Sequence, residues 1–258
     1  MELTIHDVGH GGCITLLHEN GNVMMWDCGN SDAVRPSTFL PEIGVHSIDY
    51  FLVTNYDEDH ISDLPELRDA LTIRSIFRNK SIDADQLRSL KKETGPISTA
   101  MESLLDMIGS YTGGPLTPAL DFPKVTKRIF YHDYSEKFDD TNNLNLVTFL
   151  QCGTTKFLFP GDLEAKGWEA MLAKSTFVSE LESVNVFIAS HHGRENGYCE
   201  AVFDHCNPIV VVMSDGPKKH ATQEMVNAYA KHASGIRFNN EDRYVLTTRN
   251  DGSLTWTL

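Results

Sequence analysis

The segment at positions 48–64 reads IDYFLVTNYDEDHISDL. Its first half is a continuous apolar run of the kind that forms a buried strand, and the polar residues after it lie on a turn that leads into a helix. Because carboxylate and imidazole groups are good metal ligands, Asn55, Asp57, Asp59 and His60 could converge there on a cation. A simpler interpretation remains open at this point: Asp59 caps the following helix, and Asp57 is a solvated loop charge.

Two later segments also place polar residues directly after an apolar strand. The sequence FLFPGD at 157–162 ends in Asp162, which could be a metal ligand or only the N-cap of the next helix. The sequence VFIASHHG at 186–193 carries His191 and His192 side by side, and adjacent histidines are an uncommon choice for packing. All three polar clusters therefore follow the C-terminal end of a predicted strand.

The other apolar patterns predict one α/β domain over residues 1–258, with a helical insertion at about 80–125. Strands are expected within 1–27, where ENGN makes a hairpin turn, and at 48–54, 146–150, 156–159, 184–189, 209–213, 243–248 and 253–257. Helices are expected at 83–110, broken at Gly95 and Pro96, and at 163–172 and 222–233, with a loop at 109–123. Because the hairpins are too short for crossover connections, many strands are expected to be antiparallel.

Composition and charge limit the possible functions. The chain has 258 residues, 41% of them hydrophobic, which is enough for a real core. Its net charge of −14 disfavours a general nucleic-acid coat or an anionic-membrane binder, but it does not exclude a nuclease whose local site is charged by metal. The N-terminus has no signal-peptide pattern and no apolar run reaches about 18 residues, so a cytoplasmic protein without membrane contact is expected. The five cysteines are odd in number and lack C-x-x-C spacing, which argues against a disulfide framework or a zinc ribbon.

The order of these segments resembles the metallo-β-lactamase fold, in particular the branch that includes the hydrolase domain of ComEC-like DNA-uptake proteins. The matching motifs are DVGHG at 7–11, DCG at 27–29, NYDEDH at 55–60, NNLNLV at 142–147, GD at 161–162 and HHG at 191–193. Each motif is weak alone, but their order and spacing match the family from about residue 3 to the last strands. The resemblance implies a four-layer αββα sandwich.

Departures from the family pattern concern the first of two metal sites. Where dinuclear members have the motif His-x-His-x-Asp-His, this chain has Asn55 and Asp57 in place of the first two histidines. The second site keeps Asp59, His60, Asp162 and one of His191 and His192. The resemblance therefore implies one tight zinc or manganese site. It also implies a second, oxygen-rich site that is weak or absent.

The family chemistry implies that a bound metal lowers the pKa of water to about 7 for attack on the substrate. The candidate catalytic residues are then Asp59, His220 and Arg194. His220 stands where many members carry a further histidine, and it could protonate the leaving group, add a ligand, or simply be a surface residue. Arg194, with Lys218 and Lys219, could hold a phosphate, or these residues could be ordinary solvated cations.

Two functional hypotheses follow. The first is a metal-dependent hydrolase, most consistent with a phosphodiesterase or nuclease acting on nucleic acid or nucleotides. The second is a catalytically degenerate family member that binds a ligand or a protein partner. A β-lactam substrate is disfavoured by the lack of an export signal and of the first-site histidines. The insertion would lie over the site in such a fold, as a substrate lid or as plain packing helices.

Overall fold

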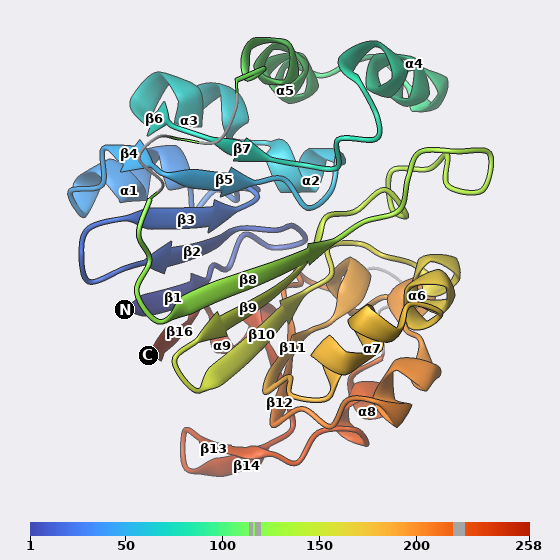
Figure 1. Cartoon of the computed structure of the whole chain (residues 1–258). Coiled ribbons are helices and arrows are strands. Elements are labelled where there is room, and N and C mark those ends of the chain that lie inside the picture. The colour runs from blue at the N-terminus through green and yellow to red at the C-terminus, as the bar shows by residue number, and fades with distance from the viewer. Residues whose placement is uncertain (114–115, 117–119, 219–224) are drawn as a thin grey trace.

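The computed structural model describes residues 1–113, 116, 120–218 and 225–258. Two six-stranded sheets pack face to face, and helices lie on the outer side of each sheet (Figure 1). The first sheet has the order β16-β1-β2-β3-β5-β7, with bounds Leu254–Thr257, Glu2–Ile5, Ile14–Leu17, Val23–Trp26, Tyr50–Leu52 and Ile76–Phe77. The second has the order β15-β12-β11-β10-β9-β8, with bounds Val245–Thr247, Val210–Met213, Val186–Ile188, Thr155–Phe159, Val147–Cys152 and Val125–Phe130.

The helices divide between the two sheets. The N-terminal group consists of α1 (Pro36–Glu42), α2 (Glu58–Ile61), α3 (Leu64–Ala70), α4 (Ala84–Thr94) and α5 (Thr99–Ser110). The C-terminal group consists of α6 (Ala165–Leu172), α7 (Ser175–Leu181), α8 (Val226–Ala230), α9 (Thr248–Asp251) and the 3-10 turns η1 (Ser190–Gly193), η2 (Glu195–Gly197) and η3 (Glu200–Asp204). Two small ribbons complete the fold: β4 (Ser47–Ile48) with β6 (Thr72–Ile73), and β13 (Ile236–Phe238) with β14 (Glu241–Arg243).

Three apolar layers hold these elements together. Leu3 and Trp26 of the first sheet meet Phe157 and Phe159 of the second in the layer between the sheets. A second layer joins the first sheet to its helices, and a third joins the second sheet to α6, α7 and α8. The order helix, sheet, sheet, helix confirms the predicted αββα sandwich.

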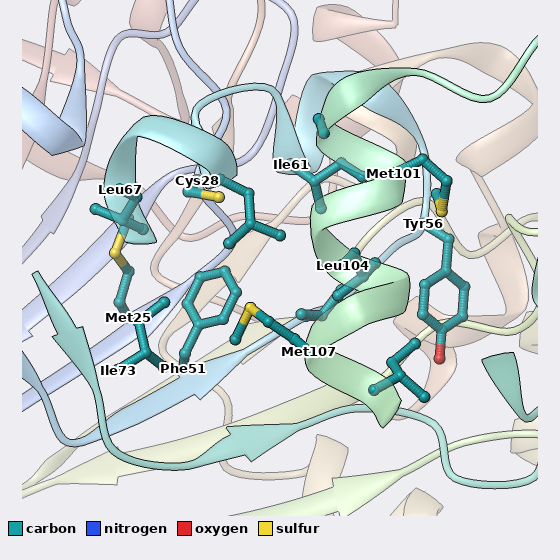
Figure 2. Packing of buried hydrophobic residues seen from close by; sticks show 14 of the residues in the cluster. Met25, Cys28, Phe51, Tyr56, Ile61, Leu67, Ile73, Met101, Leu104 and Met107 are labelled. Carbon is teal, nitrogen blue, oxygen red and sulfur yellow. The ribbon is translucent and has the colours of Figure 1, made fainter. Parts of the chain in front are cut away.

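The apolar face of α5 belongs to the second of these layers. Figure 2 shows Leu104 and Met107 of α5 beside Phe51 of β5, with Met101 near Tyr56. Helix α4 begins with a capping box between Asp83 and Gln86, and Ser98 caps α5, so the break predicted at Gly95 and Pro96 falls between two capped helices. Helix α5 therefore has a packing role.

Many strands are antiparallel, as expected, among them β1 with β2 and β9 with β10, but parallel pairing prevails at the strands that precede the polar clusters. Strand β5 is parallel to β3 and β7, and β11 is parallel to β10 and β12. The short hairpins give only antiparallel pairs, whereas the longer connections contain helices, such as α6 and α7 between β10 and β11, that act as crossovers. As a result, the carboxyl ends of neighbouring strands meet at one edge of each sheet. Within the described ranges, no helix combines the length and apolarity needed to cross a bilayer.

Candidate metal centre

Four side chains from three strand ends meet at the carboxyl edges of the two sheets. Asp59 and His60 lie on α2, just after β5; Asp162 follows β10; and His192 lies on η1, just after β11. Each offers one ligand atom, and these atoms all lie within 4.8 Å of one another. His60, Asp162 and His192 are buried, whereas the Asp59 side chain is 34% exposed.

The distances within this cluster are short. The Oδ1 atom of Asp162 lies 3.0 Å from Nε2 of His60 and 3.4 Å from Nε2 of His192. Asp59 Oδ2 lies 3.4 Å from the same nitrogen of His192. Nε2 of His192 is buried and has no hydrogen-bond partner, which is costly unless another group satisfies it. Two imidazole nitrogens and two carboxylates form a normal set for a first-row transition metal, so these residues fit a divalent cation.

The rings of both histidines are oriented by groups behind them. Nδ1 of His60 lies 2.8 Å from Oδ2 of the buried Asp27, and Nδ1 of His192 lies 2.8 Å from the backbone oxygen of Ser214. Since each partner is an acceptor, Nδ1 carries the proton in both rings, and Nε2 is directed at the cluster. A metal-binding histidine usually donates its other ring N–H to such a carboxylate or carbonyl group, which fixes the orientation of the ring.

The imidazoles and carboxylates of the cluster shift one another's pKa values. Burial alone would lower the pKa of His192, but Asp162 and Asp59 outweigh it and raise this pKa to about 10. Burial likewise opposes the charged form of His60, yet Asp162 and Asp27 raise its pKa well above the usual value. Burial would raise the pKa of Asp59, but the neighbouring His192 and the charge of His60 outweigh it and lower this pKa to about 2. The carboxylates thus require positive charge in this pocket, whether from protons or from a cation.

Two glycine-containing loops enclose the backbone of α2. The amide of Gly12 donates to the carbonyl of Asp59 (3.1 Å), and the amide of Gly29 donates to the carbonyl of Gly12 (2.8 Å). A Cβ atom at Gly12 would lie only 2.7 Å from Oδ2 of Asp27 and 2.8 Å from Nδ1 of His60. The close approach of backbone and side chains therefore explains why glycines occupy positions 11, 12 and 29.

The turn that carries the adjacent histidines has an unusual backbone. His191 and His192 have φ values of 51° and 54°, and Gly193 has a φ of 74°, so three consecutive residues are left-handed. This conformation costs a histidine on the order of 1–3 kcal/mol. Ser190 Oγ donates to the carbonyls of Gly161 and Leu163 (3.1 and 2.5 Å), which ties η1 to the loop that contains Asp162.

The capping interpretations do not describe Asp59 and Asp162. The N-cap residue of α2 is Asp57, that of α3 is Asp63, and that of α6 is Glu164. Asp59 and Asp162 instead direct their carboxylates at the histidines.

Asn55 and Asp57, predicted as metal ligands, have other partners. Asn55 is fully buried, and its Nδ2 donates to Oδ1 of Asn142 (3.2 Å) while its Oδ1 accepts from the amide of Asp57 (2.8 Å). Oδ1 of Asp57 accepts from Nζ of Lys91 (2.7 Å) and from Oγ1 of Thr141 (2.9 Å). Asp57 is not a member of the four-residue cluster.

His191 and Arg194 lie beside the cluster and not within it. Nε2 of His191 is 3.9 Å from Oδ2 of Asp162, and its Nδ1 is 3.7 Å from Oε1 of Glu164. Burial lowers the pKa of His191, in contrast to that of His192. Nη1 of Arg194 lies 3.3 Å from Nε2 of His191. Lys218 is exposed, and His220 and Lys219 lie outside the described residues.

Sequence reasoning assigned no role to Asp27, Glu164 or Lys91. Asp27 follows the apolar strand VMMW, and this position after a buried strand is the same signal that pointed to the other polar clusters. Lys91 and Glu164 offered no such signal, because their contacts depend on how distant segments pack.

The architecture and the placement of this cluster define a metallo-β-lactamase fold. Among solved structures, the chain is similar to the metallo-β-lactamase fold protein YhfI from Bacillus subtilis, with 11% identity over 100% of both chains and a TM-score of 0.54. It is equally similar to Zn²⁺-bound PqqB from Methylobacterium extorquens, with 11% identity, full coverage of both chains and a TM-score of 0.55.

A third similar structure has a different chemistry. CmlA, a diiron β-hydroxylase from Streptomyces venezuelae, is 13% identical over 99% of this chain and 54% of its own, with a TM-score of 0.54. Neither a family model nor a curated protein sequence matches the chain. At such low identities the likeness establishes the fold, and the function has to be argued from the site.

Proposed function

We propose that this protein is a metal-dependent hydrolase. The observation that carries the proposal is the buried cluster of Asp59, His60, Asp162 and His192, with Nε2 of His192 lacking a hydrogen-bond partner. A buried set of two imidazoles and two carboxylates, oriented by Asp27 and the carbonyl of Ser214, has no role in packing that apolar residues would not fill better.

The donor set fits zinc or manganese, held by the four residues of the cluster. Such an ion, once bound, supplies Lewis-acid activation of water and of the scissile group. Asp27 keeps Nδ1 of His60 protonated and so keeps Nε2 available to the site. The inner wall of the pocket is apolar, formed in part by Ile14, Phe159 and Ile188, and it excludes solvent from the sheet side of the cluster.

We infer a phosphodiester substrate, either a nucleic acid or a nucleotide, and a place in the ComEC-like branch of the superfamily. The supporting features are the family motifs and Arg194, whose guanidinium lies beside His191 next to the cluster and can pair with phosphate oxygens. On sequence grounds alone, we also propose His220 as the proton donor to the leaving group. Five free thiols agree with a reducing, cytoplasmic location.

A degenerate binding module is the second candidate. Its support is that Asp57 and Asn55 bond to protein groups, so one of the two family metal sites lacks its ligands. The buried cluster argues against it, since a binding scaffold has no need of such residues.

The test compares Asp162→Asn with Glu164→Gln. Asp162 belongs to the cluster, whereas Glu164 is a carboxylate only two residues away and outside it. After growth with zinc or manganese, each protein is analysed for bound metal and for hydrolysis of bis(4-nitrophenyl) phosphate. We expect Asp162→Asn to lose both metal and turnover, and Glu164→Gln to keep its metal. A wild-type protein that retains no metal under supplementation would favour the binding module.

A further inference from the structure

Lys91 forms an ion pair with Asp57, close in the chain to the candidate metal centre. It lies in the last turn of α4, and its Nζ is 2.7 Å from Oδ1 of Asp57, an oxygen that also accepts from Thr141 (2.9 Å). Asp57 precedes Asp59 by two residues at the start of α2. The Lys91 side chain is 20% exposed, so the pair is partly shielded from solvent.

The backbone amide of Asp57 and the neighbouring asparagine side chains also have protein partners. Its backbone amide donates to Asn55, Asn55 donates to Asn142 (3.2 Å), and Asn142 donates to Oε1 of Glu164 (3.0 Å). This hydrogen-bonded chain runs from Asp57 to Glu164, alongside the cluster. The amide oxygens of Asn55 and Asn142 therefore each accept one protein N–H group, and each keeps a second lone pair.

Helix α4 is held so that Lys91 stays in this place. Oγ of Ser98, which caps α5, donates to Oε2 of Glu58 in α2 (2.5 Å), and α5 packs through its apolar face. Helix α4 thus contacts the start of α2 through Asp57, and the N-cap of α5 contacts it through Glu58. A lysine ammonium is a compact positive charge with three hydrogen-bond donors, so it can neutralise one carboxylate.

We propose that the Lys91 ammonium is a built-in cation that takes the place of a second metal ion beside the centre. Asp57 is then neutralised by the chain itself, and the protein binds one divalent cation. This inference rests on the proposed metal centre, and it concerns the second site that the resemblance implies to be weak or absent. It also explains how a family motif can lose its first two histidines while its aspartate and histidine remain in place.

The experiment is equilibrium dialysis against millimolar Mn²⁺, with metal analysis of the wild-type protein, Lys91→Met and Lys92→Met. Methionine keeps the length of the side chain and removes its charge. Lys92→Met makes the same change at an exposed neighbour on the same helix. We expect one equivalent in the wild type and in Lys92→Met. Lys91→Met should bind a second equivalent with a Kd of about 0.1–1 mM, the range of weak oxygen-ligand sites.

Two further variants identify the residues involved. Lys91→Met combined with Asp57→Asn should lose the second equivalent, and Lys91→Arg should retain one. Circular dichroism melting shows whether each variant folds. Two equivalents in the wild type, or one in a folded Lys91→Met, would overturn the role of Lys91 while leaving the metal centre intact. Failure of the proposed function would give a different result. The wild type would then bind no metal, or its bound metal would not depend on Asp162.

Discussion

Oδ2 of Asp27 lies 2.8 Å from Nδ1 of His60, although 33 positions separate the two residues in the chain. Asp27 is buried and also accepts from the amide and the hydroxyl of Thr54, so its carboxylate is fixed on two sides. The pair joins the end of β3 to α2 and decides which nitrogen of His60 faces Asp162. The end of β3, which contributes no residue to the cluster, is therefore linked to the candidate metal centre.

Replacing Asp27 by Asn should weaken metal binding about 10- to 100-fold, the usual effect of losing an outer-shell carboxylate. Asn tolerates the left-handed φ of 56° at this position, so the backbone should not change. Its amide cannot supply the negative charge that holds His60. The measurement is zinc competition against a chromophoric chelator. An affinity equal to that of the wild type would show that Asp27 acts only on Thr54.

The adjacent histidines should differ sharply in their effect on metal content. His192 belongs to the cluster, whereas His191 lies 3.9 Å from Oδ2 of Asp162 and outside it. Asn is the suitable replacement at both positions, because it accepts positive φ better than Ala does. We expect His192→Asn to lower bound metal at least about tenfold and His191→Asn to keep most of it. Metal analysis after dialysis decides this, and equal losses would mean that both rings bind the ion.

Adding one methyl group at Gly12 should disturb the Asp27–His60 pair. The new Cβ would lie 2.7 Å from Oδ2 of Asp27, so the carboxylate has to move. We expect Gly12→Ala to lose about 1–3 kcal/mol of stability, the usual range for overpacking, together with much of its metal affinity.

Gly109 provides the matched control for that change. It is an exposed residue in α5, and a Cβ there meets nothing within 4 Å. Gly109→Ala should therefore raise stability by about 0.5–1 kcal/mol and leave metal binding unchanged. Urea unfolding of both variants measures the difference, and a neutral Gly12→Ala would contradict the close packing at the α2 turn.

The buried His132 should make the protein sensitive to acid. Burial lowers its pKa from 6.5 to about 4, while its Nε2 donates to the carbonyl of Gly167 (2.9 Å) and its ring stacks on Phe138. Between pH 6.5 and 4 the unfolded chain binds a proton that the folded protein does not. The contribution of neutral His132 to the free energy of unfolding is therefore complete above pH 6.5. It is lost as the pH falls toward 4, by up to about 1.4 kcal/mol per pH unit.

His132→Gln keeps an N–H donor and removes this titration, so its stability should fall less steeply over the same range. Urea unfolding of metal-free protein at pH 7, 5.5 and 4.5 provides the comparison. The metal is removed by chelation, because binding of a metal to histidine ligands depends on pH over about the same range. His205→Gln, at an exposed position, is the control and should follow the wild type. Parallel curves for His132→Gln and the wild type would show that His132 does not contribute.

Much of this architecture could be predicted from local patterns. The apolar runs before Asp59, Asp162 and His192 are short and continuous, as in buried strands. The spacing of apolar residues and the turn residues predict strands and helices, because both depend only on residues that are close in sequence. The motif order then pointed to the αββα sandwich. The parallel pairs β3–β5, β10–β11 and β11–β12 do not follow from these patterns, because they depend on helical crossovers and not on the hairpins that short-range signals reveal.

Tertiary structure alone decided which polar residues act together. By itself the sequence determined that Asp59, His60, Asp162 and a histidine pair follow buried strands. It could not distinguish His192 from His191, because that choice depends on the left-handed turn of η1 and on the carbonyl of Ser214 behind the ring. Nor could the sequence show that Lys91, 34 positions away, forms an ion pair with Asp57. Contacts of this kind arise from the packing of α4 and α5 on the first sheet. Such long-range contacts produce no periodic pattern of apolar and polar residues in the sequence.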